Sequence, residues 1–294
     1  MQIDDLSNKE TTINNNNNNN NKSNYKVKNL IIIGMAGSGK TTFIQKLEES
    51  IINYKQTKYN SNNNIDPYLI NLDPAVYNCL YEPNLDIRDT VNYKEIMKAH
   101  SLGPNGAIVT SLNLFSTNIH KVIDLLDNKI KESFSVINSN NLNGIKDSLE
   151  IIVDTPGQLE VFSWSASGKI ITDSLSLLAP TIIFYVVDLV RCQNPNTFIS
   201  NMMYALSIMY KMKLDLYIVF NKSDTVKDDK CTSWLVNYSL LQSELDKDKT
   251  YLSTFSNSLC LTLEEFYKTI KYYSVSSKTG EGFDNLIKDI LTYI

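Results

Sequence analysis

The chain has 294 residues, 43% of them hydrophobic and 20% charged, which is the composition of a folded globular protein. Its net charge of -4 at pH 7 and its isoelectric point near 5.3 argue against a surface that binds nucleic acid. The 2 histidines and the 4 scattered cysteines, which form no C-x-x-C pair, make histidine catalysis and a structural zinc site unexpected. No apolar run approaches the length of a membrane span, so we expect a cytoplasmic protein without a membrane partner.

Residues 1–26 are expected to form a disordered tail. They include an unbroken asparagine run at 14–21, and so polar a segment cannot bury enough apolar surface to offset the entropy of ordering. Asparagine clusters at 60–64 and 138–143 separate well-patterned segments and are interpreted as enlarged loops without a binding role. One domain is therefore expected over residues 27–294.

A phosphate-binding loop is predicted at 34–41. The segment reads GMAGSGKT and satisfies the pattern G-x-x-x-x-G-K-[ST] at every fixed position. It follows a short apolar run at 28–33 and precedes helical spacing at 42–47, which is the order of strand, loop and helix that such a loop requires. The alternative, an ordinary glycine-rich turn, is disfavoured because the whole pattern and both flanks agree.

The loop residues have separate roles in holding nucleotide phosphates. Glycines let the backbone approach the phosphates, while the loop N–H groups and the helix N-terminus offer partial positive charge. Lys40 is expected to reach the β- and γ-phosphates, and the Thr41 hydroxyl is expected to bind Mg²⁺. The residues predicted to contact the phosphates are Gly34, Gly37, Ser38, Gly39, Lys40, Thr41 and Thr42.

Strands and helices alternate along the rest of the chain. Apolar runs predict strands within 68–74 and at 149–154, 181–188, 216–220 and 273–275. Helical patterns cover 93–100, 107–130, 195–212 and 281–293, and the segment GPNG at 103–106 is interpreted as a break between two helices. This alternation predicts an α/β fold of the P-loop NTPase type, with a mostly parallel, doubly wound sheet. Helical insertions are expected at about 92–134 and about 232–272.

Two predicted strands end on acidic residues, Asp73 and Asp154, where open α/β sheets bind ligands. Asp154 begins the pattern D-x-x-G of nucleotide switches, in which the acid lies near Mg²⁺ and the N–H of Gly157 meets the γ-phosphate. A plain β-turn is the weaker alternative, given the preceding strand and the upstream phosphate loop. Gln158 and Glu160 carry groups that can orient the attacking water, although for Glu160 an ordinary solvated side chain is an equal alternative.

The segment Asn221–Asp224 reads NKSD and identifies the base. An aspartate carboxylate accepts hydrogen bonds from both N1–H and the 2-amino group of guanine, whereas adenine offers neither donor. The stem of Lys222 is expected to lie along the purine, and the loop beginning at Ser276 is expected to contact the guanine oxygen. The sequence therefore predicts a site for GTP and GDP with Mg²⁺.

The chain resembles the GPN-loop GTPases over essentially residues 27–294. The segments that carry this resemblance are 34–41, 71–75, 86–91, 103–105, 154–162 and 164–168. It implies a homodimer, or a heterodimer with a paralogue, in which Asn105 of one subunit reaches the γ-phosphate region of the other and holds the attacking water together with Gln158. From local chemistry alone, an ordinary turn between helices is the preferred interpretation of 103–106.

The same resemblance assigns roles to other residues. Asp73 and Asp154 correspond to the Mg²⁺-side acids, which makes Thr41, Asp73 and Asp154 the expected metal residues. Glu160 corresponds to a member of the water network, and the guanine readers correspond to Asn221 and Asp224.

The biological role is also implied by the resemblance. Eukaryotic members point to RNA polymerase II subunits as partners, to assembly and nuclear import of that polymerase, and to shuttling between cytoplasm and nucleus. Two alternatives are a client-binding scaffold or chaperone that nucleotide stabilises and whose hydrolysis is incidental, and a P-loop kinase, which the NKSD segment disfavours.

Overall fold

The structure is a computed structural model that describes residues 26–59, 65–139, 148–247, 266–267 and 269–292. Seven strands form one sheet in the order β3-β2-β4-β1-β5-β6-β7, and every pair of neighbours is parallel. The strands are β1 (Lys26–Gly34), β2 (Tyr68–Asn71), β3 (Leu85–Asp86), β4 (Ser148–Asp154), β5 (Thr181–Asp188), β6 (Asp215–Asn221) and β7 (Lys271–Val275). The predicted parallel α/β sheet is thereby confirmed.

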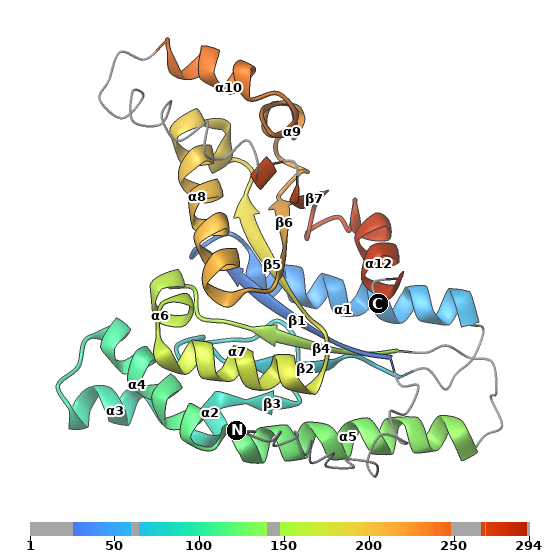
Figure 1. The fold of residues 1–294 in the computed structure, drawn as a ribbon. Coiled ribbons are helices and arrows are strands. Elements are labelled where there is room, and N and C mark those ends of the chain that lie inside the picture. The colour runs from blue at the N-terminus through green and yellow to red at the C-terminus, as the bar shows by residue number, and fades with distance from the viewer. Residues whose placement is uncertain (1–25, 60–64, 140–147, 248–265, 268, 293–294) are drawn as a thin grey trace, which may run out of the picture.

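Helices cover both faces of the sheet (Figure 1). Those packed on one face are α1 (Lys40–Tyr59) and α12 (Phe283–Thr292). Those contributing to the core on the other face are α2 (Ile87–Thr90), α3 (Tyr93–Ala99), α4 (Pro104–Thr117), α5 (Ile119–Ser139), α6 (Leu159–Ser163), α7 (Ala166–Leu178), α8 (Pro195–Met212), α9 (Asp229–Val236) and α10 (Tyr238–Leu245). A 3₁₀ turn, η1 (Arg191–Gln193), precedes α8.

Strand β5 shows why the sheet needs helices on both sides. Phe184 and Val186 belong to the core beneath α1 and α12, whereas Tyr185 and Val187 belong to the core of the opposite face. Successive side chains of a strand point to opposite faces, so a strand that is apolar throughout must be covered twice. The continuous apolar run in the sequence therefore already indicated a central strand.

Three local features differ from the sequence-based expectations. Strand β3 was not predicted, because two residues are too few to produce a periodic signal. Helices α6 and α7 were not predicted either. The predicted break between two helices lies at 100–103, and residues 104–106 already belong to α4, because Gly103 is its N-cap and Pro104 its first residue. Proline is favoured there, since the first N–H of a helix has no partner within the helix.

Parts of the chain named in the sequence analysis lie outside the described residues. These are the tail up to residue 25, the asparagine cluster at 60–64, residues 140–143 of the second cluster, and 248–265 of the second insertion. Within the first insertion the structure has α3, α4 and most of α5, and the second contains α10 and most of α9. The domain boundaries themselves stay a prediction.

A buried ion pair lies at the end of the sheet opposite the carboxyl ends of the strands. Lys55 of α1 and Glu150 of β4 are 1% and 0% exposed, and their charged atoms Nζ and Oε2 are 2.7 Å apart. The Lys55 ammonium also donates to the carbonyls of Ile65 and Ser148. Burial lowers the pKa of the neighbouring Lys28 to about 8, against the effect of Glu150. The pair ties α1 to the central strands.

None of the helices that the structure describes has both the length and the apolar character needed to cross a lipid bilayer.

Candidate functional site

The predicted phosphate loop connects β1 to α1 with a backbone that only glycine adopts easily. Gly37 and Gly39 have φ angles of 81° and 89°, in the left-handed region that L-residues rarely occupy. At Gly34, a Cβ atom would lie 2.4 Å from the carbonyl oxygen of Val186, so a side chain cannot fit. The glycines of the motif are thus explained by the geometry of the loop.

Lys40 is the first residue of α1, and its side chain folds against the loop. Its ammonium donates to the carbonyls of Gly34 at 3.0 Å and Met35 at 3.4 Å. Burial lowers the pKa of Lys40, and the carboxylates of Asp154 and Asp73 oppose this effect. The two predicted acids therefore lie within electrostatic reach of the lysine.

Ser38 provides a test of whether the loop suits a phosphate. Its hydroxyl is buried and has no hydrogen-bond partner among the residues that the structure describes. Leaving a buried donor without an acceptor costs about 1–3 kcal/mol. A phosphate oxygen beside the loop would supply that acceptor, so the residues fit the group that the motif predicts.

Asp154 lies at the carboxyl end of β4, between two hydroxyl groups. Its Oδ2 accepts hydrogen bonds from Tyr81 at 2.9 Å and from Thr41 at 3.4 Å. Burial raises the pKa of Asp154 to about 6, although the ammonium of Lys40 and the bond from Tyr81 act in the opposite direction. The structure thus brings Thr41 and Asp154 together as predicted.

The donor set suits Mg²⁺ bound jointly with a nucleotide. Within the described ranges, no group of three or more His, Cys, Asp or Glu side chains is arranged to hold a metal by itself. Thr41 and Asp154 offer oxygen atoms, and Asp73 adds a partly exposed carboxylate near both Lys40 and Asp154. Mg²⁺ prefers oxygen and is usually bound by one or two carboxylates together with substrate phosphates and water.

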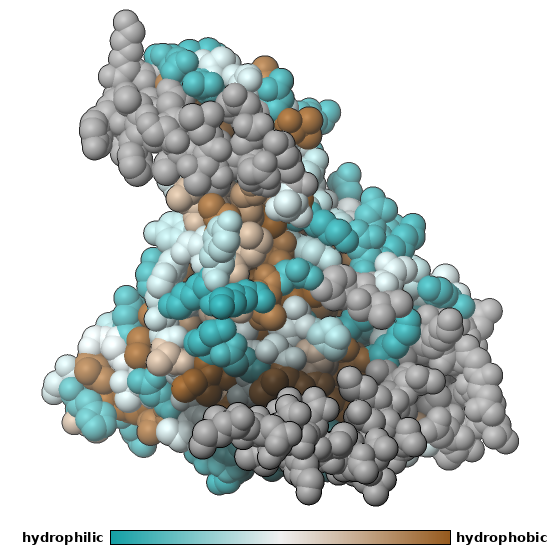
Figure 2. Space-filling model, viewed as in Figure 1, coloured by the Kyte–Doolittle hydropathy of each residue, from teal (hydrophilic) through white to brown (hydrophobic). Residues whose placement is uncertain are grey.

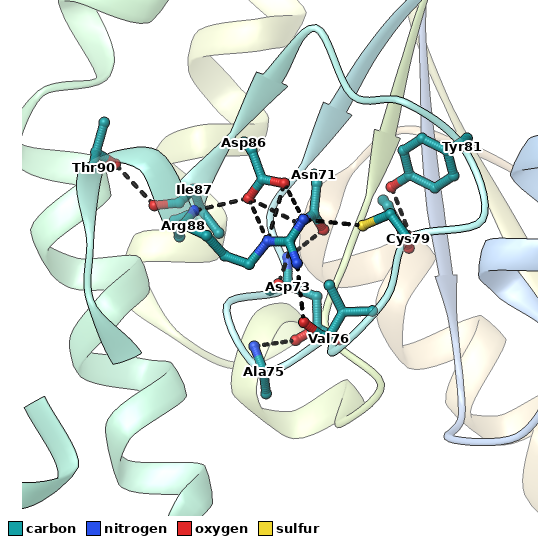
Figure 3. A network of polar contacts seen from close by, with 11 residues as sticks. Asn71, Asp73, Ala75, Val76, Cys79, Tyr81, Asp86, Ile87, Arg88 and Thr90 are labelled. Atoms are coloured by element: carbon teal, nitrogen blue, oxygen red, sulfur yellow. Dashed lines mark hydrogen bonds and ion pairs between the residues drawn. The ribbon is translucent and has the colours of Figure 1, made fainter. Parts of the chain in front are cut away.

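A network of polar contacts orders the loop that carries Asp73 (Figure 3). Arg88 forms hydrogen bonds through Nε and Nη2 to the carboxylate of Asp86, with the shortest at 2.6 Å. Its Nη1 donates to the carbonyl of Val76 at 3.2 Å. The amide of Asn71 donates to Asp86 at 3.1 Å and accepts from the backbone N–H of Asp73 at 3.0 Å. Asp73 is therefore held by a scaffold that starts at the edge of the sheet.

On the base side, Asn221 joins three loops. Its Nδ2 donates to the carbonyl of Ser38 at 3.0 Å, and its Oδ1 accepts from the N–H and the hydroxyl of Ser277 at 3.1 and 2.8 Å. A Cβ on Gly39 would lie 2.6 Å from Asn221 Nδ2, so the two loops pack in close contact. Asn221 thus braces the site, and its predicted role as a reader of the base stays a prediction.

Lys222 is a second brace between the loops. Its ammonium donates to the carbonyl of Gly37 at 2.9 Å and to Oδ2 of Asp188 at 2.6 Å. Its φ angle is 73°, which is unusual for a residue with a long side chain. The contact with Gly37 means that the side chain of Lys222 extends from the NKSD segment to the phosphate loop.

Asp224 lies exposed in the same loop, where the base is expected. Its Oδ1 accepts a hydrogen bond from the hydroxyl of Ser276 at 2.7 Å, and this bond holds the pKa of the Asp224 carboxyl below its usual range. The group is therefore ionised at neutral pH and acts only as an acceptor. That is the chemistry expected of a guanine reader.

The predicted water-orienting residues are less constrained. Gly157 lies against the phosphate loop, because a Cβ atom there would be 3.7 Å from Nζ of Lys40. Gln158 and Glu160 are exposed, and the N-cap residue Gln158 makes no capping bond through its side chain to α6. Asn105 is exposed in the first turn of α4, with no side-chain hydrogen bond to any residue of the described part.

Two residues of the site were missed by the sequence reasoning. Asp188 ends β5 and pairs with Lys222, and the signal that identified Asp73 and Asp154, an acid at a strand end, was available for it. Tyr81 lies in a segment without periodicity, so no pattern in the sequence indicated its contact with Asp154.

Comparisons with known proteins agree with this architecture. A family model described as "Conserved hypothetical ATP binding protein" matches residues 32–294. The chain is 46% identical over 263 residues to GPN-loop GTPase 1 of Dictyostelium discoideum, which covers 89% of this chain and 60% of that protein. It is 45% identical over 272 residues to GPN-loop GTPase 1 of Saccharomyces cerevisiae, covering 89% of this chain and 64% of that protein.

A solved structure shows the same fold. The crystal structure of a GTPase from Pyrococcus abyssi in its apo form superposes with a TM-score of 0.70 at 24% identity, covering 90% of this chain and 96% of that chain. The present chain spans 60%, 64% and 67% of the length of its relatives from Dictyostelium discoideum, Saccharomyces cerevisiae and Schizosaccharomyces pombe, respectively. The matched family model and the identity to these relatives together show that the chain belongs to the GPN-loop GTPase family.

Proposed function

We propose that the protein is a Mg²⁺-dependent GTP hydrolase that works as a dimeric nucleotide switch in the assembly and nuclear import of RNA polymerase II. The observation that carries the GTP assignment is Asp224, an ionised carboxylate held by Ser276 in a loop that Asn221 and Lys222 join to the phosphate loop. The names of the relatives support hydrolysis of GTP. The role in polymerase assembly rests on the family resemblance alone.

Catalysis in such a site depends on positioning and charge stabilisation without a protein nucleophile. Lys40 and the loop N–H groups bind the phosphates, and Thr41, Asp73 and Asp154 hold the cation side. Mg²⁺ would neutralise the charge that develops on the phosphate oxygens. Gln158 is placed directly after Gly157, where its carboxamide can accept from the attacking water and donate to a phosphate oxygen.

Phosphate release from GTP and ATP is the direct test, because the description of the matched family model names ATP. The purified protein with Mg²⁺ should release phosphate from GTP and leave ATP intact, since adenine offers no donor pair to Asp224. Release without an added acceptor separates hydrolysis from a kinase reaction. Equal use of both nucleotides would contradict the base assignment.

Substituting Gln158→Leu is expected to slow GTP turnover by about 100-fold or more, because the water-orienting group is lost. Binding should persist, since no predicted phosphate contact changes. Single-turnover hydrolysis and fluorescent GDP titration measure the two quantities separately. Gln242→Leu, an exposed glutamine of α10, is the matched control. A loss of affinity as large as the loss of rate would instead make Gln158 a binding residue.

Exposed apolar surface supports a partner subunit. Figure 2 shows apolar surface over the part of the molecule that α7 occupies in Figure 1, and this helix exposes Ile170 and Leu177, the latter by 89%. Tyr210 of α8 is also exposed, and Lys169 donates to the carbonyl of Met212, which links the two helices. Contiguous apolar patches on soluble proteins commonly mark interfaces.

Completion of the pocket by the partner is tested with Asn105→Ala. We expect turnover to fall at least about tenfold, in line with the loss of one group that orients water in the transition state. The dimer mass from light scattering and the GTP affinity should be retained. Asn113→Ala, an exposed residue farther along α4, is the control. Unchanged turnover would remove the Gly-Pro-Asn segment from the mechanism.

A groove in the structure favours the scaffold as a second candidate function. It has a volume of about 880 Å³ and lies between β3, α3, α4 and α5, with Leu85, Ile96, Phe115 and Val122 among its apolar lining residues. Grooves of this size and character are typical binding sites. If a non-hydrolysable GTP analogue supports complete cycles of client binding and release, the scaffold is favoured over the switch.

A further inference from the structure

The loop at 72–84, between β2 and β3, contacts the strand-end acid through Tyr81. The tyrosine hydroxyl donates to Oδ2 of Asp154 at 2.9 Å. The ring is 6% exposed and belongs to the core beneath α1, together with Phe43 and Ile152. Tyr81 therefore combines a buried anchor with a polar group aimed at the nucleotide site.

The two hydroxyl groups at Asp154 meet the same carboxylate oxygen. Thr41 donates to Oδ2 at 3.4 Å, and Tyr81 donates to that atom at the shorter distance. Among the described residues, no hydrogen bond is made to Oδ1. Tyr81 and Thr41 therefore constrain the carboxylate of Asp154 through a single oxygen, with Tyr81 at the shorter distance.

The ends of the loop are anchored independently, so Tyr81 does not depend on Asp154 for its position. Arg88 contacts the carbonyl of Val76 and lies 3.5 Å from Sγ of Cys79, on the stretch that leads to Tyr81 (Figure 3). After Tyr81, the side chain and backbone of Asn84 pair with the backbone of Leu69 at 2.7 and 2.9 Å. Because the loop is anchored on both sides of Tyr81, the tyrosine hydroxyl can orient the carboxylate of Asp154.

We propose that Tyr81 is a positioning residue for the cation side of the nucleotide site, acting through Asp154. It holds Oδ2, which also accepts from Thr41 on the expected cation side, and so keeps the carboxylate in one orientation, in the way that outer partners orient metal ligands in other sites. The inference rests on the proposed Mg²⁺–nucleotide function. Under this proposal the loop at 72–84 contributes two residues to the cation site. Asp73 contributes directly, and Tyr81 contributes indirectly through Asp154.

The test is Tyr81→Phe, which removes the hydroxyl and keeps the buried ring. Release of fluorescent GDP is followed at increasing Mg²⁺ concentration and, separately, in excess EDTA. We expect the Mg²⁺ concentration for half-maximal retention of GDP to rise about tenfold, the lower end of the effect of removing an outer partner. Release in EDTA should be unchanged, because no nucleotide contact is altered.

Tyr185→Phe is the matched control, since it removes another buried tyrosine hydroxyl. That hydroxyl donates to Asn201 at 3.2 Å and lies away from the cation side. Its Mg²⁺ midpoint should equal that of the wild type. Asn84→Ala, which removes the side-chain anchor to Leu69 on the Tyr81 side of the loop and away from Asp73, should raise the midpoint in the same direction by a smaller factor. It replaces Tyr81→Phe if thermal unfolding shows that variant to be poorly folded.

The outcomes separate the inference from the proposed function. An unchanged midpoint in the Tyr81 variant, or an equal acceleration of release in EDTA, overturns the positioning role. GDP release from the wild type that is insensitive to Mg²⁺ overturns the proposed function itself.

Discussion

Substituting Asp224→Asn should weaken GTP binding by about 100-fold to 10,000-fold, because two charge-assisted hydrogen bonds of about 1.5–3 kcal/mol each are lost. The new amide also places a donor opposite the 2-amino group of guanine. Xanthosine triphosphate carries an oxygen at that position, so its affinity should rise in the variant. Competition of each nucleotide against fluorescent GDP measures both changes.

Asp229→Asn, an exposed aspartate in the first turn of α9, provides the control for loss of one negative charge on this side of the molecule. It should leave the preference for GTP intact. If the Asp224 variant bound GTP as well as the wild type does, the NKSD segment would not be the base reader. Binding of ATP, which the description of the matched family model names, would then be the favoured hypothesis.

Substituting Lys55→Met is expected to lower the free energy of unfolding by about 3–5 kcal/mol, because it leaves the carboxylate of Glu150 buried and without its closest cation. Methionine keeps the length of the side chain, so the loss reports mainly the charge. The carbonyls of Ile65 and Ser148 also lose a donor. Urea unfolding followed by circular dichroism measures the change.

Two further variants make this measurement specific. Lys131→Met removes the exposed pair with Asp127 and should change stability by less than about 1 kcal/mol, since water screens that pair. The double variant Lys55→Met with Glu150→Leu should recover most of the loss, because a buried pair can be replaced by apolar side chains at little cost. A Lys55 variant as stable as the Lys131 variant would mean that the buried pair does not stabilise the fold.

Site residues that belong to a local motif could be predicted from the sequence, whereas contacts between distant loops could not. The loop at 34–41 and the NKSD segment are each one uninterrupted stretch of sequence, so a local pattern can identify them. In the loop the glycines Gly37 and Gly39 occur where φ is positive, and in NKSD the aspartate is the residue expected to read the base. Asn221 was predicted to be a site residue from the NKSD pattern, and its contacts show a brace between loops that lie far apart in the chain. Its contact with Ser38 spans 183 positions, and no local pattern encodes such a distance.

The sequence by itself determined the fold class, because buried parallel strands must be apolar throughout and their alternation with helices leaves few arrangements. It also determined the phosphate loop, whose chemistry is complete within eight residues. Only the tertiary structure decided which side chains meet at the carboxyl ends of the strands. Tyr81 meets Asp154, and Lys222 meets both Asp188 and Gly37, because the order of the strands in the sheet brings these separate loops to one edge.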